Sequence, residues 1–133
     1  MSHTVHPYAH RLGIIRDWKS RWFASKGNYK TLLKSDILIR IFLEDRLRGM
    51  YVSNIEIERG QKTLRIVVET SRPGLIIGRS GEGAVKLKND LLSLREKLGI
   101  PTKEALKLDI KEVRYPETNA TIVSHMIADG LVK

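Results

Sequence analysis

The chain has 133 residues, with 24 Lys and Arg against 15 Asp and Glu, a formal net charge of +9 and an isoelectric point near 10.0. It contains no cysteine, which excludes disulfides and thiolate metal sites and favours a reducing, intracellular compartment. No apolar run approaches the roughly 20 residues that a membrane span needs, and no signal sequence is expected. The charge excess instead favours a polyanionic partner such as nucleic acid.

The first 28 residues predict an extended basic arm and not a folded element of their own. Residues 1–30 carry a net charge of +5, and aromatic rings are interleaved with the basic groups. Basic side chains neutralise phosphates, and aromatic rings stack on unpaired bases. An alternative, compatible with RNA contact by the basic groups, is that Trp18 and Trp22 pack against the following domain. His3, His6 and His10 lie around Pro7 without a nearby acid pair, so no metal site is predicted.

The next segments predict one helix and two strands. Leu33, Ile37 and Ile41 recur at helical spacing, so residues 29–48 are expected to form an amphipathic helix with this stripe on its apolar face. Residues 52–59 and 62–70 alternate between apolar and polar side chains, which indicates two antiparallel strands joined by a tight turn. Acidic residues at 56 and 58 fall on one face of the first strand, as is typical of a solvated strand face.

A glycine loop follows the second strand. Gly78 and Gly81 enclose Arg79 and Ser80, so the main chain can approach a phosphate backbone while a cation and a hydroxyl lie at the same spot. The spacing is too short for a nucleotide-binding P-loop, and the order of the glycines does not fit the dinucleotide fingerprint. What remains is the loop of the KH fold, which joins two helices and clamps about four nucleotides of a single strand. A plain turn without a ligand is the structural alternative.

The remaining chain predicts a helix over residues 83–98, a third strand over 106–114 and a closing helix over 118–131. Together with the first helix and two strands, this is an α+β fold. We expect a three-stranded mixed sheet that is covered on one face by helices. His125 and Asp129 are one turn apart in the closing helix, but a polar surface is the expected explanation. No catalytic residue, metal ligand set or cofactor site is predicted.

Two separated motifs carry a specific resemblance. The arm contains RLGIIRDWKSRWFA, and the loop region contains RPGLIIGRSGE. Both resemble the amino-terminal half of the small-subunit ribosomal protein S-three family, whose central module is a type II KH domain. The resemblance implies an arm over residues 1–28 and a KH domain over residues 29–133. It also implies a structural role in the head of the small subunit, near the entry of the messenger channel, without catalysis. Family members normally continue into a further domain.

The resulting hypothesis is a structural, non-enzymatic constituent of the small ribosomal subunit. Its expected partners are small-subunit ribosomal RNA, messenger RNA nearby and neighbouring head proteins, with no membrane, in a cytoplasmic or organellar ribosome. The alternative is a stand-alone KH adaptor for single-stranded RNA, although a generic KH module needs no such arm. The residues predicted to bind RNA are Arg11, Arg16, Lys19, Arg21, Trp22, Lys26, Arg72, Gly78, Arg79, Ser80, Gly81, Lys86 and Lys88.

Overall fold

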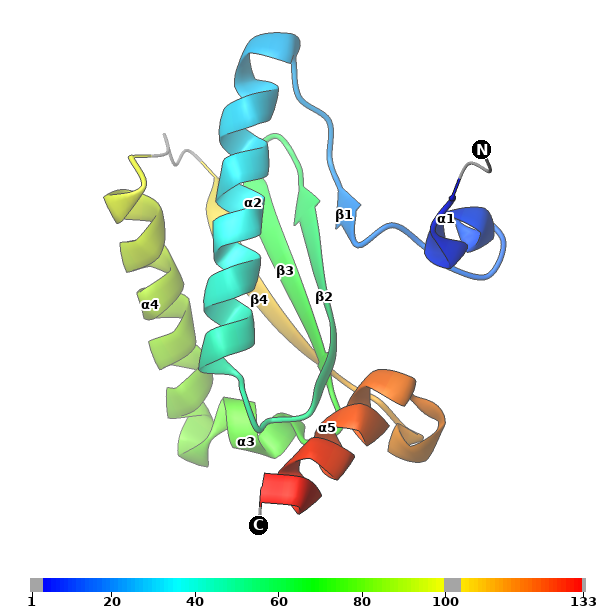
Figure 1. The fold of residues 1–133 in the computed structure, drawn as a ribbon. Coiled ribbons are helices and arrows are strands. Elements are labelled where there is room, and N and C mark those ends of the chain that lie inside the picture. Colours follow the sequence, from blue (N-terminus) through cyan, green and yellow to red (C-terminus); the bar gives the residue numbers. More distant parts are fainter. Residues whose placement is uncertain (1–3, 100–103, 133) are drawn as a thin grey trace.

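The computed structural model describes residues 4–99 and 104–132, which form an α+β domain with an amino-terminal extension (Figure 1). Two long helices, α2 and α4, lie side by side over one face of a single sheet, and α3 lies at one end of it. The elements in chain order are α1 (Pro7–Arg11), β1 (Ser20–Arg21), α2 (Lys26–Arg46), β2 (Val52–Arg59), β3 (Thr63–Thr70), α3 (Pro73–Ile77), the 3-10 turn Arg79–Gly81, α4 (Glu82–Lys97), β4 (Ala105–Glu112), the 3-10 turn Pro116–Thr118 and α5 (Ala120–Val132).

The sheet is mixed and has the spatial order β1-β2-β3-β4. β2 and β3 are antiparallel, whereas β4 runs parallel to β3. The three strands predicted from alternation are therefore present, each within two residues of its expected ends. The fourth strand is an addition to the prediction, because Ser20 and Arg21 of the arm pair in parallel with Ile57 and Glu58. Two residues are too few to show an alternating pattern in the sequence.

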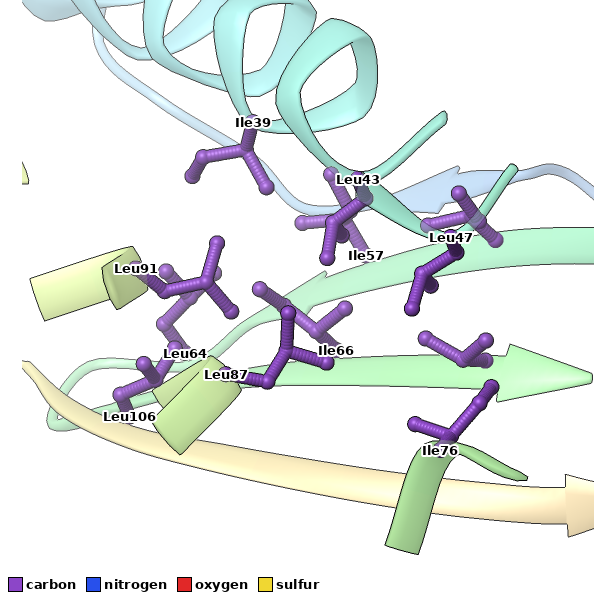
Figure 2. Packing of buried hydrophobic residues seen from close by; sticks show 12 residues of the cluster. Ile39, Leu43, Leu47, Ile57, Leu64, Ile66, Ile76, Leu87, Leu91 and Leu106 are labelled. Atoms are coloured by element: carbon purple, nitrogen blue, oxygen red, sulfur yellow. The ribbon is translucent and has the colours of Figure 1, made fainter. Parts of the chain in front are cut away.

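The hydrophobic core lies between the sheet and the two long helices (Figure 2). Ile57, Leu64 and Ile66 of the central strands are fully buried, and they face Leu43 of α2 and Leu91 of α4. Burying one such side chain contributes about 1.5–3 kcal/mol. The core thereby fixes α4 against the sheet, and α4 carries the glycine loop at its start.

Helix α2 buries a different face from the one that the sequence predicts. Leu33, Ile37 and Ile41, expected on the apolar face, are 40%, 49% and 50% exposed. The buried face instead contains Ile39 and the carboxylate of Asp36. The reason is that a second apolar stripe at four-residue spacing, Ile39, Leu43 and Leu47, packs in the core on the sheet. Helix α2 is consequently apolar both on its buried face and along an exposed stripe.

Asp36 belongs to a buried cluster of charges. The Arg59 guanidinium donates to Asp36 Oδ1 from Nη2 at 2.6 Å and from Nε at 3.0 Å. A third donor, Arg59 Nη1, lies 3.0 Å from Oε2 of Glu104, the residue before β4. The arm joins this cluster through Trp22, whose indole N–H donates to Asp36 Oδ2 at 2.6 Å. The side chains of Arg59 and Asp36 are only 4% and 3% exposed, so each charge depends on its partners.

Arg40 of α2 makes a second attachment of the arm. Its guanidinium donates to the Lys19 carbonyl oxygen and to Ser20 Oγ, both at 2.8 Å, and also to the Ile55 carbonyl oxygen of β2. Burial lowers the pKa of Arg40 from its ordinary value. The arm next to β1 is therefore held by one side chain that reaches both the arm and the strand beside it.

Helix α5 lies at the end of the sheet where β2 begins (Figure 1). It packs against β2 and the 3-10 turn before it, and it buries Ile122 completely. Its last two turns expose Ile127 and Leu131 by 59% and 82%. The predicted closing helix is present, but it covers the end of the sheet and not the middle of a face.

Candidate nucleic-acid interface

The glycine loop joins α3 to α4 through the 3-10 turn Arg79–Gly81. Gly78 has φ +71° and Gly81 has φ +81°, in the left-handed region that side chains disfavour. Ser80 between them also has a positive φ, 55°. Because both glycines lack a side chain, nothing on them holds an approaching strand away from the loop backbone.

A third glycine, Gly83, allows α3 and α4 to cross in direct contact. A Cβ at this position would lie 2.5 Å from the carbonyl oxygen of Ile76 and 2.9 Å from that of Ile77. A Cβ on Gly78 would lie 3.1 Å from the Gly83 nitrogen. The sequence predicts no role for Gly83, although a glycine in the first turn of a helix, where alanine is favoured, is a signal that points to close packing.

The basic residues predicted around this loop are exposed: Arg72, Arg79, Lys86 and Lys88. Within residues 4–99 and 104–132, none of these four cations forms an ion pair with a carboxylate. Their charges are therefore available to an outside anion. This placement is what the sequence-based prediction of RNA contact requires, and the contact itself stays a prediction.

The start of α4 adds to the positive character of the loop. Gly81 is the N-cap residue and offers no side-chain acceptor, so the amides of the first turn have no cap hydrogen bond from it. The positive end of the helix dipole points the same way. Beside it lies an open hollow of about 380 Å³, lined by Ser80, Glu82, Val85, Lys86 and Asn89. Loop, helix start and hollow form one continuous surface.

Four of the basic arm residues are also exposed: Arg11, Arg16, Lys19 and Lys26. The Arg11 guanidinium donates to the Pro7 carbonyl oxygen at 2.9 Å, and Lys19 Nζ lies 5.6 Å from the centroid of the Tyr8 ring. Neither contact neutralises a charge with a carboxylate. Arg11, Arg16 and Lys19 belong to the segment that leads into β1, the edge strand of the sheet, and Lys26 begins α2.

Arg21 differs from the other arm cations, because it is already paired inside the protein. Its guanidinium contacts Asp17 at 2.5 Å and Glu56 at 2.9 Å, and it also contacts Glu58. The hydrogen bond with Glu58 raises the pKa of Arg21 and lowers the pKa of Glu58. The sequence shows no acidic run beside Arg21, but the sheet brings two carboxylates to it from β2. An RNA phosphate has to compete with them.

Arg21 is the first of a row of alternating charges that crosses the open face of the sheet. The row has one residue from each strand, Arg21, Glu58, Arg65 and Asp109. Arg65 lies 3.3 Å from Glu58 Oε2 and 2.5 Å from Asp109 Oδ2, and the Asp109 hydrogen bond raises the pKa of Arg65. Because each charge has an opposite neighbour, this row is balanced and offers a polyanion little attraction. The acidic residues at 56 and 58 are thus paired and not simply solvated.

Trp22 occupies the junction between the arm and α2. Its indole N–H is used by Asp36, and its ring centroid lies 5.2 Å from that of Tyr29. This is the packing that the alternative interpretation of the tryptophans expects, while RNA contact by Trp22 stays a prediction. Two aromatic residues nearby are more open to a base, with Trp18 53% and Phe23 93% exposed. Their high exposure was not visible in the sequence.

The described residues contain no group of three or more His, Cys, Asp or Glu side chains placed to hold a metal ion. In residues 4–99 and 104–132 there is also no helix with both the length and the apolar character to cross a membrane.

Comparison with known proteins agrees with this geometry. The model of the KH domain family matches residues 38–118, which include α3, the glycine loop and α4. The chain is 44% identical over its whole length to the small ribosomal subunit protein uS3 of Solibacter usitatus, and 41% identical to that of Caldicellulosiruptor saccharolyticus. It is 38% identical over 98% of its length to uS3 of Nitrosococcus oceani. The chain spans 36%, 57% and 56% of these relatives, respectively. The predicted resemblance is confirmed, and none of these names describes an enzyme.

Proposed function

The chain belongs to the KH domain family, and on that premise we propose that it is a structural constituent of the head of the small ribosomal subunit. In this proposal the basic arm and the KH domain bind ribosomal RNA near the messenger entry channel. The relatives named uS3 support the proposal, because the similarity includes the arm as well as the domain. The role needs no catalysis, metal or cofactor. The proposed location is the ribosome of the cytoplasm, with an organellar ribosome as the alternative.

The observation that carries the proposal is the glycine loop with its free cations. Backbone without side chains at Gly78 and Gly81, a helix start without a side-chain cap and the exposed Arg79 lie together on the surface. Such an arrangement binds phosphates through main-chain amides and charge, without reading the bases. It suits a protein that holds a folded RNA in place.

The arm supports the ribosomal role over a stand-alone KH adaptor. The family model begins at residue 38, so the arm and the first part of α2 lie outside the KH module itself. The arm is nevertheless attached to the domain by the hydrogen bonds of Trp22 and Arg40 and by the pairing of β1 with β2. A KH module that only binds single-stranded RNA through its glycine loop does not require a second basic segment attached to the domain.

The test is sedimentation of the full chain with small ribosomal subunits through a high-salt cushion. We expect the protein to remain with the subunits at salt concentrations that remove loosely bound basic proteins. A parallel sample with the arm deleted up to residue 18, which leaves β1 in place, should dissociate at lower salt. A pool that stays free of subunits and still binds single-stranded RNA would support the adaptor instead.

We also propose that α2 faces a neighbouring head protein. Helix α2 has an exposed apolar stripe of four residues spaced four apart: Tyr29, Leu33, Ile37 and Ile41. Exposed apolar rows of this kind are typical of protein interfaces. Ile37→Asp should leave the isolated protein folded, since the side chain is half exposed, but reduce its retention in subunits. Crosslinking from residue 37 to RNA alone would contradict this assignment. Proximity to messenger RNA is proposed only from the resemblance to the S-three family.

A further inference from the structure

Tyr51, in the connection between α2 and β2, has an unusual backbone conformation. Its φ is +51°, and apart from Ser80 it is the only non-glycine residue with a positive φ in residues 4–99 and 104–132. A bulky aromatic residue pays free energy to adopt this region, which Gly or Asn enters more readily. Strained residues of this kind persist where the surrounding structure needs their side chain in one place.

The strained backbone places the Tyr51 ring against Arg72. The Arg72 guanidinium carbon lies 4.6 Å from the ring centroid, which is a cation–π contact. The two segments are also joined by their backbones, since the Ser71 N–H donates to the Tyr51 carbonyl oxygen at 3.3 Å. Thr70 Oγ1 accepts from the Arg72 N–H at 3.0 Å and donates to the Met50 carbonyl oxygen at 2.7 Å. Arg72 is therefore held both at its backbone and at its guanidinium.

The other end of the tyrosine is directed to α5. The Asp129 carboxylate of α5 raises the pKa of the Tyr51 hydroxyl, and both residues line the same pocket. The ring is thus held against Arg72 at its face, on the side of the molecule where α5 lies.

We infer that Tyr51 is a positioning residue for RNA binding, which fixes the Arg72 guanidinium where it meets a phosphate of the strand held by the glycine loop. Arg72 is the N-cap residue of α3 and Gly78 is its C-cap residue. A helix of five residues spans about 8 Å, which is well within a bound strand of about four nucleotides. The inference deepens the proposed function and rests on it.

The test is a double-mutant cycle on the full chain, with a short single-stranded RNA as the probe. Arg72→Ala removes the cation, Tyr51→Leu removes the ring while keeping an apolar side chain, and the third variant carries both changes. A cation–π contact of ordinary strength predicts that Tyr51→Leu weakens RNA binding about two- to fivefold. The double variant should bind no more weakly than Arg72→Ala, because the tyrosine acts only through the arginine.

Two further variants separate positioning from folding. Tyr51→Asn adopts a positive φ more easily, so it should keep the melting temperature while it loses RNA affinity as Tyr51→Leu does. Tyr51→Phe keeps the ring and should bind RNA within twofold of the unchanged protein. In the free protein, the NMR signals of the Arg72 side chain should show the ring-current shift of a stacked guanidinium, and Tyr51→Leu should abolish it.

The outcomes distinguish this inference from the proposed function. If Arg72→Ala weakens RNA binding and Tyr51→Leu does not, or if the two effects are additive, the inference is wrong while RNA binding by the loop stands. If neither Arg72→Ala nor a charge change at Arg79 alters RNA affinity, the proposed loop surface fails and the inference fails with it.

Discussion

The arm and the segment with the glycine loop are both basic in the sequence, but their charges are paired differently in the structure. Residues 1–30 hold a net charge of +5 and residues 72–98 hold +3, so the arm looks like the stronger anion-binding surface. In the fold, however, Arg21 of the arm is shared among three carboxylates, whereas Arg79 of the loop and Lys86 of α4 form no ion pair in the described residues. Net charge along a chain thus overstates what a ligand meets wherever the fold brings acids to the same place.

The two surfaces also differ in how they are held. The loop is fixed by the crossing of α3 and α4 at Gly83, which is a purely steric arrangement. The arm is fixed by polar contacts of Trp22, Arg21 and Arg40. Changes to charge should therefore loosen the arm, and changes to shape should disturb the loop.

The largest expected effect comes from removing the buried anchor of the arm. Asp36→Ala leaves the Arg59 guanidinium, only 4% exposed, with one carboxylate fewer, and it deprives Trp22 of its acceptor. Breaking a buried ion pair from one side costs about 3–5 kcal/mol, which denaturant unfolding will measure. Asp45→Ala on the same helix, with a side chain 73% exposed, is the control and should change stability by less than about 0.5 kcal/mol. Equal effects of the two variants would show that the cluster is not an anchor.

Gly83→Ala should come next, because it attacks the shape of the loop. The added Cβ meets two carbonyl oxygens at 2.5 and 2.9 Å, so α3 or α4 has to move, at a cost of about 1–3 kcal/mol. RNA affinity should fall together with thermal stability. Gly130→Ala in α5 is the matched control, since nothing lies within 4 Å of its Cβ, and alanine should stabilise that helix by up to about 1 kcal/mol. A stable Gly83→Ala protein would refute the close crossing.

Changing both Arg79 and Ser80 to Asp tests whether the glycine loop binds RNA. Both residues are exposed, so melting and circular dichroism should stay unchanged. Negative charge at the positive end of α4 should weaken binding of single-stranded RNA at least tenfold, about 1.4 kcal/mol. The double variant Lys107→Asp with Lys111→Asp in β4 is the control for overall charge, and it should weaken RNA binding much less. Similar losses from the two double variants would mean that net charge alone, and not the loop, binds the RNA.

A smaller effect is expected on the salt dependence of RNA affinity, which should differ between Arg16 and the paired Arg21 of the arm. Arg16→Gln should lower the slope of log affinity against log salt by about 0.7–0.9, as expected for the loss of one phosphate contact. Arg21→Gln should lower the slope less, because its charge is already compensated by Asp17, Glu56 and Glu58. Affinity titrations of both variants at several salt concentrations provide the measurement. Equal slopes for the two would show that RNA displaces the carboxylates from Arg21.

The smallest expected effect is a pH dependence of the arm. Asp17 and Glu58 have lowered pKa values, through the Trp18 backbone N–H for Asp17 and through Arg21 for Glu58. Their contribution is therefore complete above the pKa of the unfolded chain, about 4, and is lost as the pH falls through the lower folded value. Tryptophan fluorescence should report a loosening of the arm below about pH 4. Glu58→Gln should flatten this transition, and an unchanged transition would exclude the contribution of Glu58.

The local part of this structure could be predicted from the sequence, and the part that depends on distant partners could not. Alternation over 52–59 predicted β2, because each strand residue faces either the core or the surface. The buried face of α2 was predicted wrongly, because the helix has two apolar stripes and only its packing on the sheet decides that Ile39 and Leu43 are buried. The strand at Ser20 was missed for the same reason, as its pairing with Ile57 joins residues far apart in the chain.

The candidate site also has features that could be predicted locally and features that depend on distant partners. The positive φ angles of Gly78 and Gly81 follow from the motif, and so does the exposure of Arg79. Neither the capture of Arg21 by carboxylates nor the steric need for Gly83 is visible locally, because both depend on how two elements meet. Spacing in the sequence predicted the loop, and the packing of elements decides which of its neighbours are free.

The reach of Arg40 has a consequence for the protein before it meets any partner. Its guanidinium donates to the Ile55 carbonyl oxygen just before the point where β1 begins to pair with β2, so that part of the edge of β2 is no longer open to a strand of another copy. Unprotected strand edges are templates for aggregation and strand exchange. The hydrogen bond from Arg40 therefore protects this stretch of the β2 edge against pairing with another copy of the chain.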